Sequence, residues 1–371
     1  MRISKIDAVP IRLPRDIKGA TGTAGSPTVL AAGGDDYRWS EVYPCLYSIH
    51  FETAVIRIEM EDGRVGWGES QAPLAPEVAC TIIDRLLKPV LLNEVFDGSV
   101  ERIEELWLRM YSTMRVRGQT GGFMMDAIAG IDIALWDLAG QIQQKPVSFL
   151  LTEEPKQKVP AYLSGVARGS TDTRGFQKVK LFFDTHSQED FFRQMDSLAP
   201  DVEVAVDALW RHDPESSLRF GKQLDQRKAL WFEAPLLPED PVPHAQLAQE
   251  IQTPVALGES YRTCFEMKPF FEASALGIYQ PDLGRTGLTE GRRLAALSSS
   301  YGVPVVPHVS IAFGPQLAAA LHFSAAFCEL TEYNPSVLAM ANQYLHEPIR
   351  LEGSSYIIPQ QSGLGVDLHL P

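Results

Sequence analysis

Residues 202–207 read Val-Glu-Val-Ala-Val-Asp, an alternating apolar run that ends in Asp207. Two later apolar runs also end in acids, Leu-Trp-Phe-Glu at Glu233 and Val-Ala-Leu-Gly-Glu at Glu259, and each acid follows the previous one by 26 residues. A strand-helix unit of this length places the three acids at the C-terminal ends of successive parallel strands, the face on which a β/α barrel carries its chemistry. Three carboxylates there predict a hard-cation site, which suits Mg²⁺ better than zinc.

The same alternation of short strands and helical segments extends from about residue 159 towards the C-terminus. The strand-like runs lie at 159–163, 177–183, 202–207, 230–235, 255–259, 276–282 and 303–308. A rhythm sustained this long predicts a parallel sheet, and a closed barrel accommodates it better than an open one. Residues 340–371 return to turn-rich, strand-like sequence and are expected to fold back on the N-terminal part.

The N-terminal part reads as antiparallel sheet followed by helices. Its strand-like runs share alternating apolar residues and lie at 2–12, 52–60 and 64–69. Asp62-Gly63, between the last two, is a strong hairpin signal. Residues 76–118 and 126–143 look helical, and the second of these segments has apolar residues at helical spacing that predict one buried stripe. The long segment 13–50 is expected to be either a functional lid or a disordered insertion.

Composition narrows the classes of partner. The chain has 371 residues, of which 45% are hydrophobic, and its net charge of −14 repels nucleic acid and anionic membranes. A small anionic substrate therefore needs a local cation, which a metal supplies. The four cysteines include no Cys-x-x-Cys pair, which indicates reduced thiols in a cytoplasmic protein. The first residues alternate as a strand does and do not resemble a signal peptide, and no apolar run approaches membrane-spanning length.

A histidine and a further acid accompany the three carboxylates. Gln280-Pro281-Asp282 ends one predicted strand and Val306-Pro307-His308 ends the next. On adjacent strand ends the carboxylate of Asp282 can hydrogen-bond His308, fix its tautomer and raise its basicity. A single acid at a strand end more often caps the following helix, but three in register favour a functional site.

These motifs resemble those of the enolase superfamily, in the mandelate racemase and muconate lactonizing enzyme group, across essentially the whole chain. The matching residues are Gly66-Trp67-Gly68-Glu69, the run Gly130 to Gly140, the evenly spaced acids, Gln280-Pro281-Asp282 with Gly284 and Gly287, Pro307-His308, and Gly363-Leu364-Gly365.

The resemblance implies an α/β fold, a (β/α)₇β modified TIM barrel with an α+β capping domain. We expect the capping domain at 1–125, the barrel at 126–340, and a segment at 341–371 that packs back on the capping domain. The resemblance also implies Mg²⁺, removal of a proton α to a carboxylate, and an enediolate stabilised by the metal. A homo-oligomer is expected by the same analogy.

The resemblance assigns roles to further residues. Asp207, Glu233 and Glu259 hold Mg²⁺, and Lys180 supplements its charge. Glu332 occupies the place where relatives often have a carboxylate that, when protonated, hydrogen-bonds the substrate carboxylate. Glu329, in the same short segment, competes with Glu332 for that place.

Two departures from the family pattern bear on the reaction. Many relatives have Lys-x-Lys on the second strand, with the second lysine as a base opposite the histidine. Counting from Gly175 aligns Lys180 with the first lysine of this motif and Phe182 with the second, so the second lysine base is absent. The rival register aligns Lys178 and Lys180 with the two lysines. Strand alternation does not separate the two, because 178, 180 and 182 share one face. Leu209 stands where relatives have Asn or a catalytic His.

With Phe182 in the second place, two-base racemisation is excluded and a one-base reaction is left. His308 would remove the α-proton and then protonate the departing β-hydroxide, which describes an acid-sugar dehydratase that yields a 2-keto-3-deoxy acid. Lys178, Arg38 and Tyr43 are the candidate substrate-binding residues, the last two within the 13–50 segment. The alternatives are a cycloisomerase or epimerase, favoured by the rival register, and a non-catalytic homologue that binds metal and acid sugar.

Overall fold

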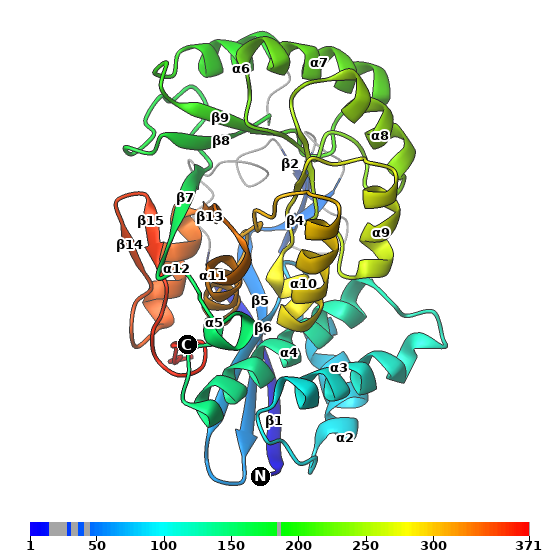
Figure 1. Ribbon diagram of the computed structural model, residues 1–371, viewed down its shortest axis with the longest axis vertical. Helices are drawn as coiled ribbons and strands as arrows, with labels where there is room; N and C mark the ends of the chain where they lie inside the picture. Colours follow the sequence, from blue (N-terminus) through cyan, green and yellow to red (C-terminus); the bar gives the residue numbers. More distant parts are fainter. Residues whose placement is uncertain (15–27, 31–35, 41–44, 184–186, 371) are drawn as a thin grey trace.

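The computed structural model describes residues 1–14, 28–30, 36–40, 45–183 and 187–370 (Figure 1). Over these residues the chain forms an α/β structure, in which a capping domain lies beside a barrel of parallel strands. Within the same described residues, no helix combines the length and the apolar character needed to cross a membrane.

The capping domain is built on a three-stranded antiparallel sheet with the order β1-β5-β6. Its strands are β1 (Ile3–Pro14), β5 (His50–Met60) and β6 (Val65–Ser70). The predicted hairpin is confirmed, because Glu59 pairs with Val65 across the Asp62-Gly63 turn. Gly63 has a φ of 86°, a conformation that glycine adopts at little cost.

Helix α4 (Gly122–Gln143) packs directly on this sheet. A Cβ atom at Gly68 on β6 would lie 1.9 Å from the carbonyl oxygen of Gly130, so only glycine allows the two backbones to approach this closely. The prediction of a single apolar stripe is too narrow, because residues 124–140 are all buried. The sheet covers one side of α4, and α10 (Leu283–Ser300) of the barrel packs against another.

The remaining helices of the N-terminal part are short except for one. They are α1 (Pro76–Ile82), the π-helical turn η2 (Ile83–Leu87), α2 (Lys88–Leu91), α3 (Val100–Arg115) and, after α4, α5 (Ser148–Leu151). The predicted helical segment is therefore interrupted before α3. Ser99 begins that helix by accepting a hydrogen bond from the N–H of Arg102 (3.2 Å).

Parallel strands form the barrel, and their order follows the chain. They are β7 (Lys158–Ser164), β8 (Lys178–Phe182), β9 (Glu203–Asp207), β10 (Phe232–Glu233), β11 (Val255–Leu257), β12 (Ile278–Tyr279) and β13 (Thr331–Tyr333). Strand β13 pairs with β7, so the last strand returns to the first. The predicted barrel is confirmed.

The predicted strand at 303–308 appears only as two isolated bridges. Val305 pairs with Tyr279, and His308 pairs with Asp282. Pro304 and Pro307 lack the N–H groups that a continuous ladder needs. The second bridge nevertheless sets His308 beside Asp282, as the sequence predicts.

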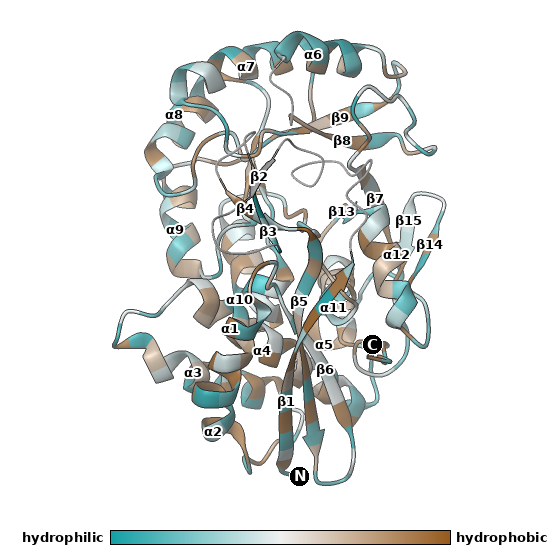
Figure 2. Cartoon of the chain, turned by 180° about the vertical axis from the view of Figure 1, so that it is seen from behind, coloured by the Kyte–Doolittle hydropathy of each residue, from teal (hydrophilic) through white to brown (hydrophobic). Residues whose placement is uncertain are grey.

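Helices surround the barrel on its outer side (Figure 1). They are α6 (Gln188–Asp196), α7 (Pro214–Arg227), α8 (Pro241–Glu250), α9 (Cys264–Glu272), α10 and α11 (Pro315–Phe327). Helices α6 and α7 carry much hydrophilic surface, whereas hydrophobic residues recur along β1 and β5 (Figure 2). Helix α11 is buried over most of its length, which places it in the core between the two parts of the molecule.

Part of the 13–50 segment is ordered as a small antiparallel sheet. Its strands are β2 (Thr28–Leu30), β3 (Tyr37–Ser40) and β4 (Leu46–Ser48), and β4 leads directly into β5. The buried carboxylate of Glu52 on β5 ties this sheet down, because it accepts hydrogen bonds from the hydroxyls of Tyr37 (3.2 Å) and Ser48 and pairs with Arg12. The described residues of the 13–50 segment therefore include a small sheet that is attached to β5.

The C-terminal tail divides its contacts between the two parts of the molecule. Helix α12 (Pro335–Tyr344) precedes the hairpin of β14 (Arg350–Glu352) and β15 (Ser355–Ile357). The hairpin pairs antiparallel with β7 of the barrel. Further along, the N–H of Leu364 donates to Asp137 on α4 (2.8 Å) and the indole of Trp67 donates to Asp367 (3.0 Å). The described part of the tail thus contacts both the barrel and the N-terminal part of the molecule.

Candidate active site

The three evenly spaced acids lie at one end of the barrel. Strand register pairs Phe182 with Asp207 and Asp207 with Glu233, and Glu259 follows the end of the next strand, β11. Asp207 and Glu233 are only 4% and 1% exposed. Carboxylates buried this deeply require partners, because the charged form is costly to remove from water.

Lys180 is the central cation of this end of the barrel. Its Nζ lies 2.6 Å from Glu233 Oε1, 3.0 Å from Glu332 Oε1 and 3.9 Å from Asp207 Oδ2. Burial alone would lower the pKa of Lys180, but Glu233 and Glu332 raise it well above the usual value. The ammonium therefore stays charged, and one positive charge faces three carboxylates.

Glu233 is fixed by neutral donors as well. Its Oε2 accepts hydrogen bonds from the indole of Trp231 (3.0 Å) and the side-chain amide of Gln280 (2.7 Å). Trp231 precedes Glu233 by two residues, so strand alternation puts both side chains on one face. Sequence reasoning assigned a role to neither donor, although this spacing was a usable signal.

His308 lies between two carboxylates. Its Nδ1 is 2.9 Å from Asp282 Oδ2, and its Nε2 is 2.6 Å from Glu259 Oε2. Burial lowers the pKa of His308, but Glu259 and Asp282 together raise it well above its ordinary value. The structure thus brings together the predicted histidine and its orienting acid.

Asp282 is held by a second set of bonds. Its Oδ1 accepts from the N–H of Gly284 (2.9 Å), which begins helix α10, and from the side-chain amide of Gln316 (3.0 Å). These two donors leave Oδ2 for His308. Gln316 comes from the start of α11, and nothing in its local sequence signals this contact.

The two competing acids near the last strand are separated by the structure. Glu332 is 2% exposed, accepts a hydrogen bond from the N–H of Val309 (2.8 Å) and faces Lys180. The side chain of Glu329 is 91% exposed and pairs with Lys156 on the outside. Although burial raises the pKa of Glu332, Lys180 and His308 hold it below its usual value. Of the two acids, Glu332 is the one that lies beside Lys180 and the barrel carboxylates.

Other predicted residues are not brought to the acids. Lys178 is two residues before Lys180, on the same face of β8. It forms an ion pair with Glu203 near the opposite end of the strand. Arg38 lies on β3 of the small sheet, where its guanidinium donates to the carbonyl of Tyr37 (3.0 Å). Tyr43 lies outside the described residues.

Phe182 and Leu209 stand where relatives can carry catalytic groups. Phe182 pairs with Asp207 across the two strands, and its ring centroid is 5.4 Å from Lys180 Nζ. An aromatic ring therefore occupies the strand position beyond Lys180. Leu209 is buried with a φ of 56°, and its N–H donates to Asp207 Oδ1 (2.9 Å). Its backbone orients the acid, and its side chain has no acid-base function.

The donor set fits a hard cation by its chemistry. Burial, followed by repulsion from Glu233, raises the pKa of Asp207 well above its usual value, which is the strain that a bound cation relieves. As placed, however, no three acidic, histidine or cysteine side chains among the described residues are gathered closely enough to hold a metal. Glu259 is turned towards His308, and it must turn back for the three oxygen ligands to converge.

The capping domain reaches the segment that follows His308. The carboxylate of Glu69, at the end of β6, accepts from the N–H groups of Phe313 (2.6 Å), Gly314 (3.1 Å) and Gln316 (3.1 Å). Nearby, the amide of Gln71 donates to the hydroxyl of Ser310 (2.7 Å). The start of α11 and the residues after the histidine are therefore anchored by another part of the molecule.

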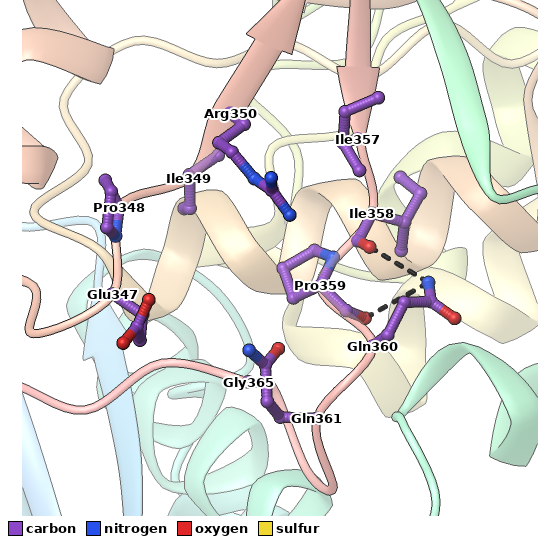
Figure 3. A pocket seen from close by; sticks show the side chains of 10 residues that line it. All are labelled: Glu347, Pro348, Ile349, Arg350, Ile357, Ile358, Pro359, Gln360, Gln361 and Gly365. Carbon is purple, nitrogen blue, oxygen red and sulfur yellow. Dashed lines mark hydrogen bonds between the residues drawn. The ribbon is translucent and has the colours of Figure 1, made fainter.

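The described residues also form two pockets and bury a further histidine, His322. Glu233 and Glu259 line a small pocket with Trp210, Tyr261 and Gln280. A larger pocket, of about 290 Å³, lies in the tail and contains none of the predicted residues; it is lined by Glu347, Pro348, Ile349, Arg350, Ile357, Ile358, Pro359, Gln360, Gln361 and Gly365 (Figure 3). His322, which has no predicted role, is buried where Ser148 N–H and the carbonyl of Leu364 contact its ring.

A capped barrel with carboxylates and a His-Asp pair at its C-terminal strand ends defines a class of barrel enzymes that act through buried acids. Residues 163–370 match the family model described as "Enolase C-terminal domain-like". Residues 46–152 match "Mandelate racemase / muconate lactonizing enzyme, N-terminal domain". The chain therefore belongs to the enolase superfamily, in the mandelate racemase and muconate lactonizing enzyme group.

Two characterised relatives span most of the chain. D-galactarolactone cycloisomerase from Agrobacterium fabrum is 29% identical over 343 residues, which cover 85% of this chain and 88% of that protein. D-galactonate dehydratase from Cronobacter sakazakii is 31% identical over 345 residues, which cover 84% and 88%. Similarity at this level divides between an isomerase and a lyase.

Solved structures agree with the fold. A putative isomerase from Sinorhizobium meliloti superimposes with a TM-score of 0.89 at 30% identity, covering 99% of this chain and 97% of that one. An L-talarate dehydratase from Polaromonas sp. JS666, crystallised with Mg and L-glucarate, gives a TM-score of 0.78 at 22% identity, with 99% and 95% covered. The second likeness supports the fold alone.

Proposed function

We propose that this protein is a Mg²⁺-dependent acid-sugar dehydratase that uses one histidine as both base and acid. The observation that carries the proposal is the pairing of His308 with Asp282, together with the aromatic ring of Phe182 beyond Lys180 on β8. His308 then supplies a proton acceptor on one side of the site. Phe182, which cannot transfer a proton, occupies the position where relatives have a second lysine base. Inversion at the α-carbon needs a base on each face, whereas elimination needs one.

His308 performs both proton transfers in this scheme. Nε2 must first be free of Glu259, which lies 2.6 Å away. It then takes the α-proton of the substrate, and the C–H electron pair moves into the adjacent carboxylate. When the bond to the β-hydroxyl breaks, the imidazolium returns its proton to the departing hydroxide, and water leaves. The enol that is left tautomerises to a 2-keto-3-deoxy acid.

Asp207, Glu233 and Glu259 are the residues that would hold Mg²⁺. When bound, the metal neutralises their charge and stabilises the negative charge that develops on the substrate carboxylate. Lys180 adds a fixed positive charge beside them, and Glu332 keeps Lys180 in place from the other side.

A screen of aldonic acids, aldaric acids and their lactones with Mg²⁺ tests the proposal. The expected result is a keto product that is one water lighter than its substrate, with exchange of the α-proton in D₂O. Both signals should be lost in His308→Asn and on chelation of the metal. Turnover that survives in His308→Asn would refute the assignment of the base.

A cycloisomerase is the second candidate, because D-galactarolactone cycloisomerase matches the chain over the same length as the dehydratases do. The single His308 base also serves an isomerisation that begins with loss of an α-proton. Mass spectrometry separates the two reactions, since an isomerase leaves the mass of the substrate unchanged. Tight binding of acid sugars with no proton exchange at all would instead favour a binding protein.

A further inference from the structure

A buried acid on α4 contacts two arginines, one from the loop after β11 and one from the first turn of α10. Asp126, in the second turn of α4, is 3% exposed. Its Oδ1 lies 3.0 Å from Arg262 Nε and its Oδ2 lies 3.2 Å from Arg262 Nη2, so the pair is bidentate. Arg285 Nη1 lies 3.8 Å from the same carboxylate. Planar, two-point contacts of this kind fix orientation as well as distance.

Arg262 lies in the loop after β11 that carries Glu259, and Arg285 lies in the first turn of α10, directly after Asp282. Arg262 follows Glu259 by three residues, and its Nη1 donates to the carbonyl of Ser260 (2.7 Å), the residue next to Glu259. Arg285 follows Asp282 by three residues, and its N–H donates to the carbonyl of Asp282 (3.0 Å). Asp126 on α4 therefore links the loop after β11 to the first turn of α10.

These links complete a ring of contacts. Glu259 and Asp282 are the two carboxylates that touch His308, at 2.6 and 2.9 Å. The separation of these carboxylates sets where the imidazole can lie and whether Glu259 can turn to the other acids. Asp126 contacts both arginines, so its carboxylate connects the chain segments that carry these two acids.

We propose that Asp126 is a positioning residue, which sets the placement of Glu259 and Asp282 around His308 through Arg262 and Arg285. This inference rests on the proposed function, in which Glu259 is a metal ligand. Without the carboxylate, the largely buried guanidinium of Arg262 loses its counter-charge, and the segment that it holds at Ser260 loosens. Arg262 is the main link, because its contacts are short and bidentate and the contact of Arg285 is longer.

Calorimetric titration of the full-length protein with Mg²⁺ tests the inference without reference to turnover. Asp126→Asn keeps the size of the side chain and removes its charge. Asp132→Asn is the matched control, because Asp132 is a buried acid of the same helix whose contacts go to Thr289, away from the strand ends. Outer-shell partners of metal ligands typically affect affinity by about 10- to 100-fold.

We expect Asp126→Asn to raise the dissociation constant for Mg²⁺ about tenfold. Asp132→Asn should leave that constant within about twofold of wild type, even if both variants lower the melting temperature. Arg262→Lys, a second variant that keeps the charge and loses the bidentate geometry, should match Asp126→Asn, and the double variant should be no worse than either single one.

Unchanged Mg²⁺ affinity in Asp126→Asn and Arg262→Lys, with wild type binding normally, would overturn the inference and leave Asp126 a packing residue. Failure of wild type itself to bind Mg²⁺ would overturn the metal site, and with it both the proposed function and this inference. The two failures are thus told apart by the wild-type titration.

Discussion

Replacing Asp282 by Asn should abolish base function while preserving the fold. Oδ1 accepts from Gly284 and Gln316, so the amide oxygen of the variant must take that side, because both partners are donors. The amide NH₂ then faces His308 Nδ1, where the wild-type carboxylate accepts (2.9 Å). The ring is forced to accept at Nδ1 and to carry its proton on Nε2, which is the wrong tautomer for a base.

The size of the loss follows from comparable dyads. An Asp-to-Asn change that imposes the wrong histidine tautomer lowers kcat by about 10⁴-fold in the serine proteases, or about 5 kcal/mol of barrier. We expect a loss of about 10³- to 10⁴-fold here. The assay is α-proton exchange in D₂O, followed by NMR, on whichever acid sugar the screen identifies.

Asp240→Asn is the matched control for this experiment. Asp240 begins α8 and accepts from the N–H of Val242 at 2.9 Å, as Asp282 does from Gly284 at the start of α10. Asn caps helices about as well as Asp, so both variants should fold normally. An Asp282→Asn protein that exchanges protons within about tenfold of wild type would refute the tautomer argument.

Three further outcomes are expected. Gly68→Ala places a methyl group on the backbone of α4 and should destabilise the protein by at least about 2 kcal/mol in urea unfolding, and a smaller cost would mean that α4 can shift. Glu332→Gln should lower turnover, whereas Glu329→Gln should leave it near wild type, and equal effects would contradict the assignment. Burial raises the pKa of Glu69 and Asp137 to about 7, so the folded state binds their protons more tightly. The free energy of unfolding should therefore fall as pH rises from about 5 to 7. The slope should be weaker in Glu69→Gln, and a rise in the free energy of unfolding over this range would contradict the raised pKa values.

The sequence predicts the barrel and the gathering of acids at one of its ends, because both depend on local pattern. Spacing alone brings Asp207, Glu233 and Glu259 to one end of the barrel, and the short motifs ending in Asp282 and His308 place that pair correctly. Asp207 and Glu233 are the last residues of their strands, Glu259 and Asp282 follow strand ends, and His308 pairs with Asp282 in an isolated bridge, so their positions follow from where the strands end.

Other features depend on register and on contacts distant in sequence. Lys178 and Lys180 share one face of a strand, and only the pairing of Phe182 with Asp207 shows which lysine reaches the acids. The side chain of Glu259 can point towards His308 or towards the other two acids, and the spacing of residues in the sequence does not predict which. Asp126 meets Arg262 across 136 residues of sequence, with no local signal for the pair.

The carboxylate of Glu69 makes the capping domain part of the machinery for holding the histidine. It accepts three backbone N–H groups at the start of α11, and Gln316, from the same turn, supports Asp282. A barrel excised from its cap would expose these donors and release the turn. Capping domains could be exchanged between relatives to obtain new substrate ranges. Such an exchange would succeed only if the transferred cap had an acid at the position of Glu69 that matched the N–H groups at the start of α11. The two halves of the molecule are therefore coupled at this junction and are not freely interchangeable modules.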